Sequence, residues 1–160
     1  MSTGSNKEGL LNVLVHEWST NQAYAKKIGI CVLYVTHGNR CTKLNAFEGG
    51  MTPTDAVDLH STQEEADTWM FLHAFHASAD GHHSINIAVF SSDTDVEVQA
   101  SQHQAAIPAE IILISGTRSR SRLVSIRQFC KKLGRRICQV LPSLHALTGC
   151  DTVSSLVGKG

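Results

Sequence analysis

The stretch INIAVFSSDTDVEV, residues 85–98, decides how we expect this chain to fold. Its first part, Ile85–Phe90, is a short and almost continuously apolar run, which is typical of a strand buried on both faces. Asp93 and Asp95 follow directly, with only Thr94 between them. Two carboxylates this close repel each other and are costly to remove from water. They therefore indicate either a solvated turn or a site that holds a positive ion.

Helices and short apolar strands alternate along the rest of the chain. The expected helices cover residues 7–18, 62–78 and 127–133, and the expected strands cover residues 30–36, 84–90, 110–115 and 122–126. Residues 47–60 are expected to be a loop. Residues 137–141 fit either a strand or a helix. We expect this element to end at Pro142, which would open a short helix that runs to about Leu147. This alternation predicts an α/β sheet covered by helices on both faces, with ligands at the carboxyl ends of its strands.

Length and composition exclude several classes of protein. The 160 residues correspond to about one domain, and their 42% hydrophobic content with no net charge is not that of a disordered tail. No apolar run approaches the ~20 residues of a membrane span, and the N-terminus lacks the pattern of a signal peptide. We therefore expect no membrane partner. Five scattered cysteines favour reduced thiols over a disulfide framework, which predicts a nuclear or cytoplasmic protein.

The charges are segregated along the chain. Between Leu44 and Thr117 there is no Lys or Arg, whereas 11 of the 14 acidic residues lie there. Eight basic residues follow between Arg118 and Arg136. Taken alone, the pattern favours two ordinary solvated faces, and the alternative is a cation-binding acidic centre beside a phosphate-binding basic surface.

The acidic residues fall into three groups at the ends of expected elements. Asp93 and Asp95 follow a strand, Glu65 and Asp67 open a helix, and Asp151 stands before another helix start. Each carboxylate taken singly has a structural explanation: a solvated turn for Asp93 and Asp95, the helix dipole for the acids that open a helix, and an N-cap for Asp151. Glu64 fits the helix explanation best, since with Ser61 it forms a capping box.

Taken in order, these groups resemble a known family. EEAD (residues 64–67), DTD (residues 93–95), a basic stretch and GCDTVSSLVGKG (residues 149–160) are similar to the PIN-like flap-endonuclease superfamily of structure-specific 5′ nucleases. The resemblance covers roughly residues 30–160. It implies a Rossmann-like, mostly parallel sheet with helices on both faces over residues 1–148. It also implies the start of a DNA-binding helix-hairpin motif over residues 149–160.

The family's site residues carry over to matching positions. By this resemblance one or two Mg²⁺ or Mn²⁺ ions would be bound by five carboxylates, namely those of Glu65, Asp67, Asp93, Asp95 and Asp151. Hard cations of this kind prefer oxygen ligands. DNA or another structured nucleic acid would be contacted by Arg118, Arg120, Arg122, Lys131, Lys132 and the hairpin turn Gly158, Lys159 and Gly160. The predicted function is metal-dependent cleavage of phosphodiesters in DNA.

Two features depart from the family pattern. Its first strand, with an Asp, has no counterpart before Ile30, and His37 stands where a second upstream Asp would be, as a candidate ligand for Mn²⁺ or Zn²⁺. The chain ends at Gly160, where the second helix of the hairpin would begin, so we expect a fragment of a longer nuclease. The alternative prediction is an inactive remnant that binds nucleic acid or another protein.

Other metal sites are disfavoured by spacing. Cys130, Cys138, His145 and Cys150 lack a Cys-x-x-Cys knuckle, and buried thiols in separate elements explain the cysteines better. The histidine pairs at 73/76 and 82/83 have no third ligand nearby, so solvated or half-buried histidines are expected there.

Overall fold

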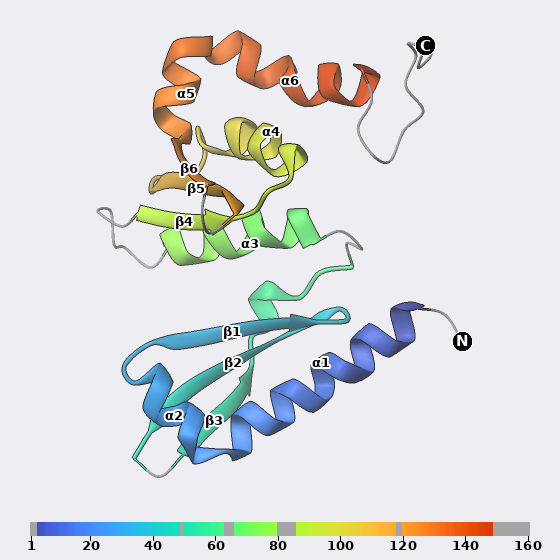
Figure 1. Ribbon diagram of the computed structural model, residues 1–160, viewed down its shortest axis with the longest axis vertical. Helices are drawn as coiled ribbons and strands as arrows, with labels where there is room; N and C mark the ends of the chain where they lie inside the picture. The colour runs from blue at the N-terminus through green and yellow to red at the C-terminus, as the bar shows by residue number, and fades with distance from the viewer. Residues whose placement is uncertain (1–2, 49, 63–65, 80–85, 118–119, 149–160) are drawn as a thin grey trace. The chain divides into compact units, whose positions relative to one another are not determined.

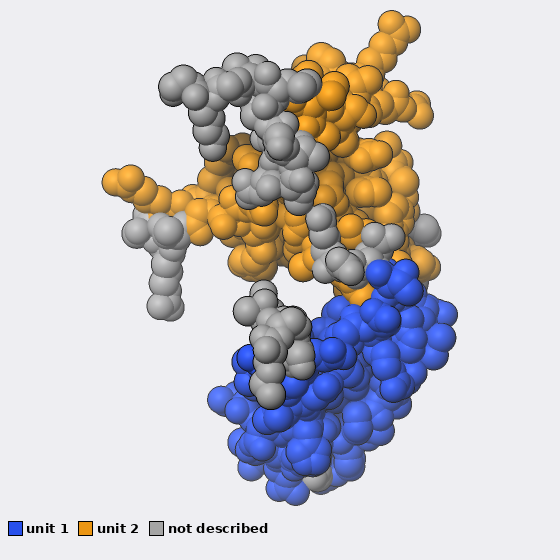
Figure 2. Space-filling view, turned by 90° about the vertical axis from the view of Figure 1, so that its right-hand side faces the viewer, with its two compact units in different colours: residues 1–65 blue, residues 66–160 orange. Residues whose placement is uncertain are grey.

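The computed structural model describes the chain except for residues 1–2, 49, 63–65, 80–85, 118–119 and 149–160. The chain divides into two compact units, residues 1–65 (unit 1) and residues 66–160 (unit 2), which Figure 2 colours separately. The described residues form six α-helices and two three-stranded sheets, which confirms the mixed α/β class. The predicted domain boundary at residue 148 stays a prediction, because residues 149–160 lie outside the described part.

Unit 1 is an antiparallel sheet with two helices. Its elements are α1 (Thr3–Thr20), α2 (Gln22–Ile28), β1 (Val32–His37), β2 (Arg40–Phe47), β3 (Gly50–Asp55) and the 3₁₀-helix η1 (Val57–Leu59), as Figure 1 shows. The strands pair in the order β1-β2-β3, with both pairings antiparallel. Gly38, with a φ of +54°, and Asn39 form the two-residue turn between β1 and β2.

Two strands of unit 1 are missing from the sequence-based prediction. Residues 47–60 were expected to be a loop, but they contain β3, and β2 was not expected at all. In β2 the fully buried residues Cys41 and Leu44 are three positions apart, so the alternation typical of a half-buried strand is absent. Pro53 is tolerated because β3 lies at the edge of its sheet.

Unit 2 contains the apolar run and the acidic residues of the stretch 85–98. Its elements are α3 (Ala66–Ala79), β4 (Asn86–Phe90), α4 (Thr94–His103), β5 (Glu110–Thr117), β6 (Arg120–Ser125), α5 (Ile126–Leu133) and α6 (Arg135–Thr148). Strands β4 and β5 pair in parallel, with α4 as the connection between them, and β6 pairs antiparallel with β5. Two small sheets, one of them wholly antiparallel, thus replace the single and mostly parallel sheet that we expected.

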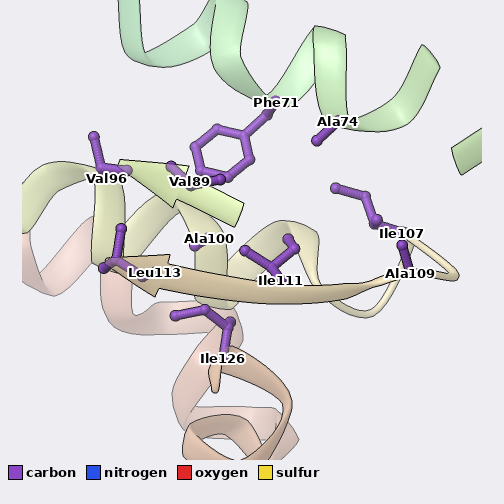
Figure 3. Packing of buried hydrophobic residues seen from close by; sticks show 10 residues of the cluster. All are labelled: Phe71, Ala74, Val89, Val96, Ala100, Ile107, Ala109, Ile111, Leu113 and Ile126. Atoms are coloured by element: carbon purple, nitrogen blue, oxygen red, sulfur yellow. The ribbon is translucent and has the colours of Figure 1, made fainter. Parts of the chain in front are cut away.

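The core of unit 2 is built around β5. Ile111 and Leu113 of this strand are almost fully buried. Phe71 and Ala74 of α3 approach the strands from one side, and Ile126 at the start of α5 approaches from the opposite side (Figure 3). Helices therefore flank β5 on both faces, as its apolar run predicts. The same prediction was wrong for β4, which is buried on one face only, because Ala88 and Phe90 are exposed.

Helices α4 and α6 also differ from the prediction. The sequence of α4 has no apolar stripe that stands out, because Val96, Glu97 and Val98 alternate as in a strand. Its buried residues Val96 and Ala100 are nevertheless four positions apart, as on one face of a helix. The whole of residues 135–148 is a single helix with Pro142 inside it, rather than two segments separated by the proline. The packing of α6 against α4 explains why the helix continues despite the backbone hydrogen bond that proline cannot make.

Two half-buried histidines of unit 2 predict how its free energy of unfolding depends on pH. Burial lowers the pKa of His103 below its ordinary value of 6.5, and burial followed by the nearby His76 lowers the pKa of His73. Below pH 6.5 the unfolded chain therefore binds protons that the folded chain does not, so the free energy of unfolding falls as the pH falls towards the lowered pKa values. We expect the melting temperature to decrease between about pH 7.5 and about pH 5.5. The variant His73→Gln/His103→Gln should show a clearly smaller decrease, and an equal decrease would contradict this assignment.

Candidate functional site

Asp93 begins helix α4 directly after β4. It has extended backbone angles, with φ of −82° and ψ of 132°, and its Oδ1 accepts a hydrogen bond from the backbone N–H of Asp95 at 3.0 Å. Its own N–H donates to Ser91 Oγ at 3.1 Å. An acidic N-cap is stabilised by the free N–H groups and by the dipole of the helix. The start of α4 therefore offsets part of the repulsion between Asp93 and Asp95 without any bound ion.

Asp95 pairs with a residue fifty positions away. Its Oδ1 lies 2.6 Å from Nε2 of His145, in the last turn of α6, and both side chains are about three-quarters buried. Because this contact uses Nε2, the Nδ1 atom of the ring does not take part in it. A carboxylate that holds one ring nitrogen fixes the orientation of the imidazole, as it does for histidines that bind metals. The pair thus links the start of α4 to the end of α6.

Glu97 is the third acidic residue at the start of α4. Its Oε1 accepts a hydrogen bond from Nη2 of Arg122 on β6 at 2.9 Å. The basic segment therefore meets the acidic stretch within unit 2. Asp93, Asp95 and Glu97 each have a partner from the chain itself, which is the structural explanation that the sequence left open.

The ends of three elements lie on the same side of unit 2. Helix α3 and strand β4 run in opposite directions, so the start of α3 lies on the side where β4 ends (Figure 1). The end of α6 is brought to the start of α4 by the contact between His145 and Asp95. Asp67 is half-buried in the first turn of α3. The start of α3, the end of β4 and the end of α6 are also the places where the sequence predicts metal ligands.

Several predicted site residues fall outside the part of the chain that the structure describes. These are Glu65, Asp151, Arg118 and the turn Gly158, Lys159 and Gly160. Within the described residues, no group of three or more His, Cys, Asp or Glu side chains could hold a metal ion. Asp93 and Asp95 have the oxygen donors that suit Mg²⁺ or Mn²⁺, but a complete ligand set would also need the residues outside the description.

His37 belongs to unit 1. It is the last residue of β1, and its Nε2 lies 2.8 Å from Oγ1 of Thr42 on the neighbouring strand. The side chain thus has a partner within its own hairpin. Its assignment as a metal ligand stays a prediction.

The predicted phosphate-binding residues that the structure describes are exposed. Arg120 and Arg122 lie on β6, and Lys131 and Lys132 lie in the last turn of α5. Arg122 is engaged by Glu97 at 2.9 Å. The exposed cations of β6 and α5 give unit 2 positive charge at its surface. Positive surfaces attract the phosphates of nucleic-acid backbones.

His145 is a functional candidate that the sequence pattern did not indicate. Its spacing from Cys130, Cys138 and Cys150 suggested only a disfavoured zinc site, and in the structure its partner is instead the carboxylate of Asp95. No local pattern could have identified the pair, because it depends on the packing of α4 against α6. The only hint in the sequence that His145 belongs to the site is its position six residues before Asp151, a predicted metal ligand.

No helix among the described residues is long and apolar enough to cross a membrane. Comparison with known proteins adds no assignment to these observations: no protein-family model, curated protein or solved structure matches the chain.

Proposed function

We propose that this chain carries a metal-dependent nuclease domain that cleaves phosphodiesters in DNA or another structured nucleic acid, in the nucleus or the cytoplasm. The fold proposed with it is PIN-like, with β4, α4 and β5 as its central strand–helix–strand unit. The observation that carries the proposal is the position of Asp93 and Asp95. They stand at the carboxyl end of a strand with a parallel neighbour, where ligands collect in α/β sheets.

The surrounding residues support the same function. Asp67, in the first turn of α3, lies on the side of unit 2 where β4 ends, and the end of α6, which precedes Asp151, is joined to α4 by the pair of His145 and Asp95. The basic residues of β6 and α5 belong to the same unit as these acids. An acidic centre beside a basic surface is the arrangement that a nuclease needs to hold both a cation and the phosphate backbone.

Each group has a distinct role in this proposal. Asp93 and Asp95, with Glu65, Asp67 and Asp151, would hold Mg²⁺ or Mn²⁺. The metal would activate water and neutralise charge on the phosphodiester as it is cleaved. Lys131 and Lys132 would hold backbone phosphates without recognising the base sequence. His145 would orient Asp95 through the contact of 2.6 Å.

A second candidate function is binding of nucleic acid without cleavage. It is favoured by the partners of the acids at the start of α4, since Asp93 caps the helix, Asp95 pairs with His145, and Glu97 pairs with Arg122. Acids that form such hydrogen bonds and ion pairs stabilise the fold without a metal. The basic surface would then bind phosphates alone.

A cleavage assay separates the two candidates. Flap and hairpin DNA are incubated with the full chain in the presence of Mg²⁺, of Mn²⁺ or of a chelator. The proposal predicts cleavage with either metal and none with the chelator. If the chain binds the same DNA in a salt-dependent way but cleaves it with neither Mg²⁺ nor Mn²⁺, the nuclease proposal is overturned and binding without cleavage is supported.

A further inference from the structure

A cavity of about 610 Å³ opens in unit 2, away from Asp93 and Asp95. It is lined by the last turn of α4, the segment that leads to β5, α5 and the start of α6. Asp93 lies at the other end of α4, whose 10 residues span about 15 Å. We propose that this cavity binds a small anionic amphiphile, with its apolar body inside and its anionic head at the rim.

The polar side chains deep in the cavity have no hydrogen-bond donor left for an anionic ligand. The side-chain amide nitrogen of Gln104 donates to the carbonyls of Ile107 at 3.3 Å and Ala109 at 2.9 Å, and its oxygen accepts from the N–H of Ile111 at 3.0 Å. The hydroxyl of Ser101 donates to the carbonyl of Val98 at 2.7 Å. An anionic group placed here would lose its water without gaining a donor from these side chains. The interior therefore favours an apolar body.

Two thiols add to the apolar wall. Cys130 Sγ donates to the carbonyl of Ser101 at 3.4 Å, and the Sγ of Cys138 lies 4.0 Å from the carbonyl of Cys130. Burial, and then the neighbouring Cys138, raise the pKa of Cys130 to about 12. This thiol is thus uncharged at neutral pH, and it behaves as a small hydrophobic side chain.

The rim has the opposite character. Arg127, Lys131 and Arg135 line it, and no carboxylate among the described residues does. Arg127 is already engaged, because its Nε lies 3.1 Å from Oε2 of Glu110. Lys131 and Arg135 have no hydrogen bond or ion pair with any of the described residues. Two unpaired cations at the mouth of an apolar cavity complement an anionic head.

The size and lining of the cavity narrow the ligand further. Its volume is within the range of about 300–1,000 Å³ typical of small-molecule pockets. No aromatic side chain lines it, so a nucleobase would find no stacking partner. An alkyl chain with a carboxylate or a similar head needs neither stacking nor interior hydrogen bonds. The proposal is therefore independent of the nuclease function.

Decanoate is a suitable probe, used below its critical micelle concentration. Added to the ¹⁵N-labelled full chain, it should shift the amide resonances of Cys130, Gly134 and Cys138. Decyltrimethylammonium, which has the same chain length and a cationic head, should not shift them. Lys131→Glu/Arg135→Glu should weaken decanoate binding about tenfold or more, since two attractive charges become repulsive. Ala105→Trp, at an exposed position of the lining, should abolish binding by filling the cavity.

The chain offers a matched control for the charge reversals. Lys132→Glu/Arg136→Glu makes the same changes one position further along α5 and α6, at exposed residues outside the lining. This variant should bind decanoate within about twofold of the unchanged chain. Equal weakening by both double variants, equal binding of the cationic probe, or no shift at the three amides would overturn the proposal. Displacement of decanoate by a short oligonucleotide that shifts the same amides would also overturn it.

Discussion

Cleavage of flap DNA is expected to fall about a thousandfold in the variant Asp93→Asn/Asp95→Asn, because metal stabilisation of developing charge supplies several kcal/mol. The substitutions keep the shape of both side chains and remove only their negative charge. Asparagine caps helices about as well as aspartate, so α4 should still begin at position 93. The amide at position 95 can still form a hydrogen bond with His145. A loss of cleavage in a folded variant would thus report the loss of charge at the metal site.

The control for this prediction is Asp58→Asn. Asp58 is an exposed acid of the 3₁₀-helix in unit 1, and the sequence gives it no role in the site. Its replacement should leave the rate of cleavage unchanged. Both variants are compared by initial rates on the same flap substrate, after circular dichroism has established that they are folded. Cleavage by the double variant at the rate of the unchanged chain would refute the assignment of Asp93 and Asp95.

The largest expected effect on stability comes from Phe71→Ala. Phe71 is only 2% exposed, packs into the core around β5, and stacks on the ring of His103 at 5.0 Å between centroids. Truncation of a buried phenylalanine costs about 3–5 kcal/mol, because it removes apolar contacts and leaves a cavity. Whole domains are stable by only about 5–15 kcal/mol. Unit 2 should therefore lose a large part of its free energy of unfolding.

Phe90 is the matched control for Phe71. It is the last residue of β4 and is 74% exposed, so Phe90→Ala should change the free energy of unfolding by no more than about 0.5 kcal/mol. Urea unfolding is followed by the fluorescence of Trp69 on α3, in a Trp18→Phe background that leaves it as the only tryptophan. Equal destabilisation by the two substitutions would contradict the position of the core described above.

The sequence predicted the elements of unit 2 whose signals are local. Strands β4 and β5 are short apolar runs, and α5 ends at Leu133, as expected. Helix α4 was missed because its first residues alternate like a strand, and only its packing identifies the buried face. The continuity of α6 through Pro142 likewise depends on contact with α4 rather than on propensity.

The same limit applies to the site. The acids at 93 and 95 could be identified as candidates from their place after an apolar run. Their partners could not, because Asp95 meets His145 across fifty residues and Glu97 meets Arg122 across twenty-five. Such pairs form only when α4, α6 and β6 pack together. Sequence patterns indicate which side chains carry the chemistry, whereas the fold decides what each of them contacts.

The central claim is that the acids of unit 2 form one metal centre, and paramagnetic Mn²⁺ tests it most directly. Titrated into the ¹⁵N-labelled chain, Mn²⁺ should first broaden the amide resonances at the start of α4 around Asp95, at the start of α3 around Asp67, and around His145. Asp93→Asn/Asp95→Asn should abolish this broadening. Broadening that is confined to other parts of the chain, or that persists in the double variant, would contradict the account.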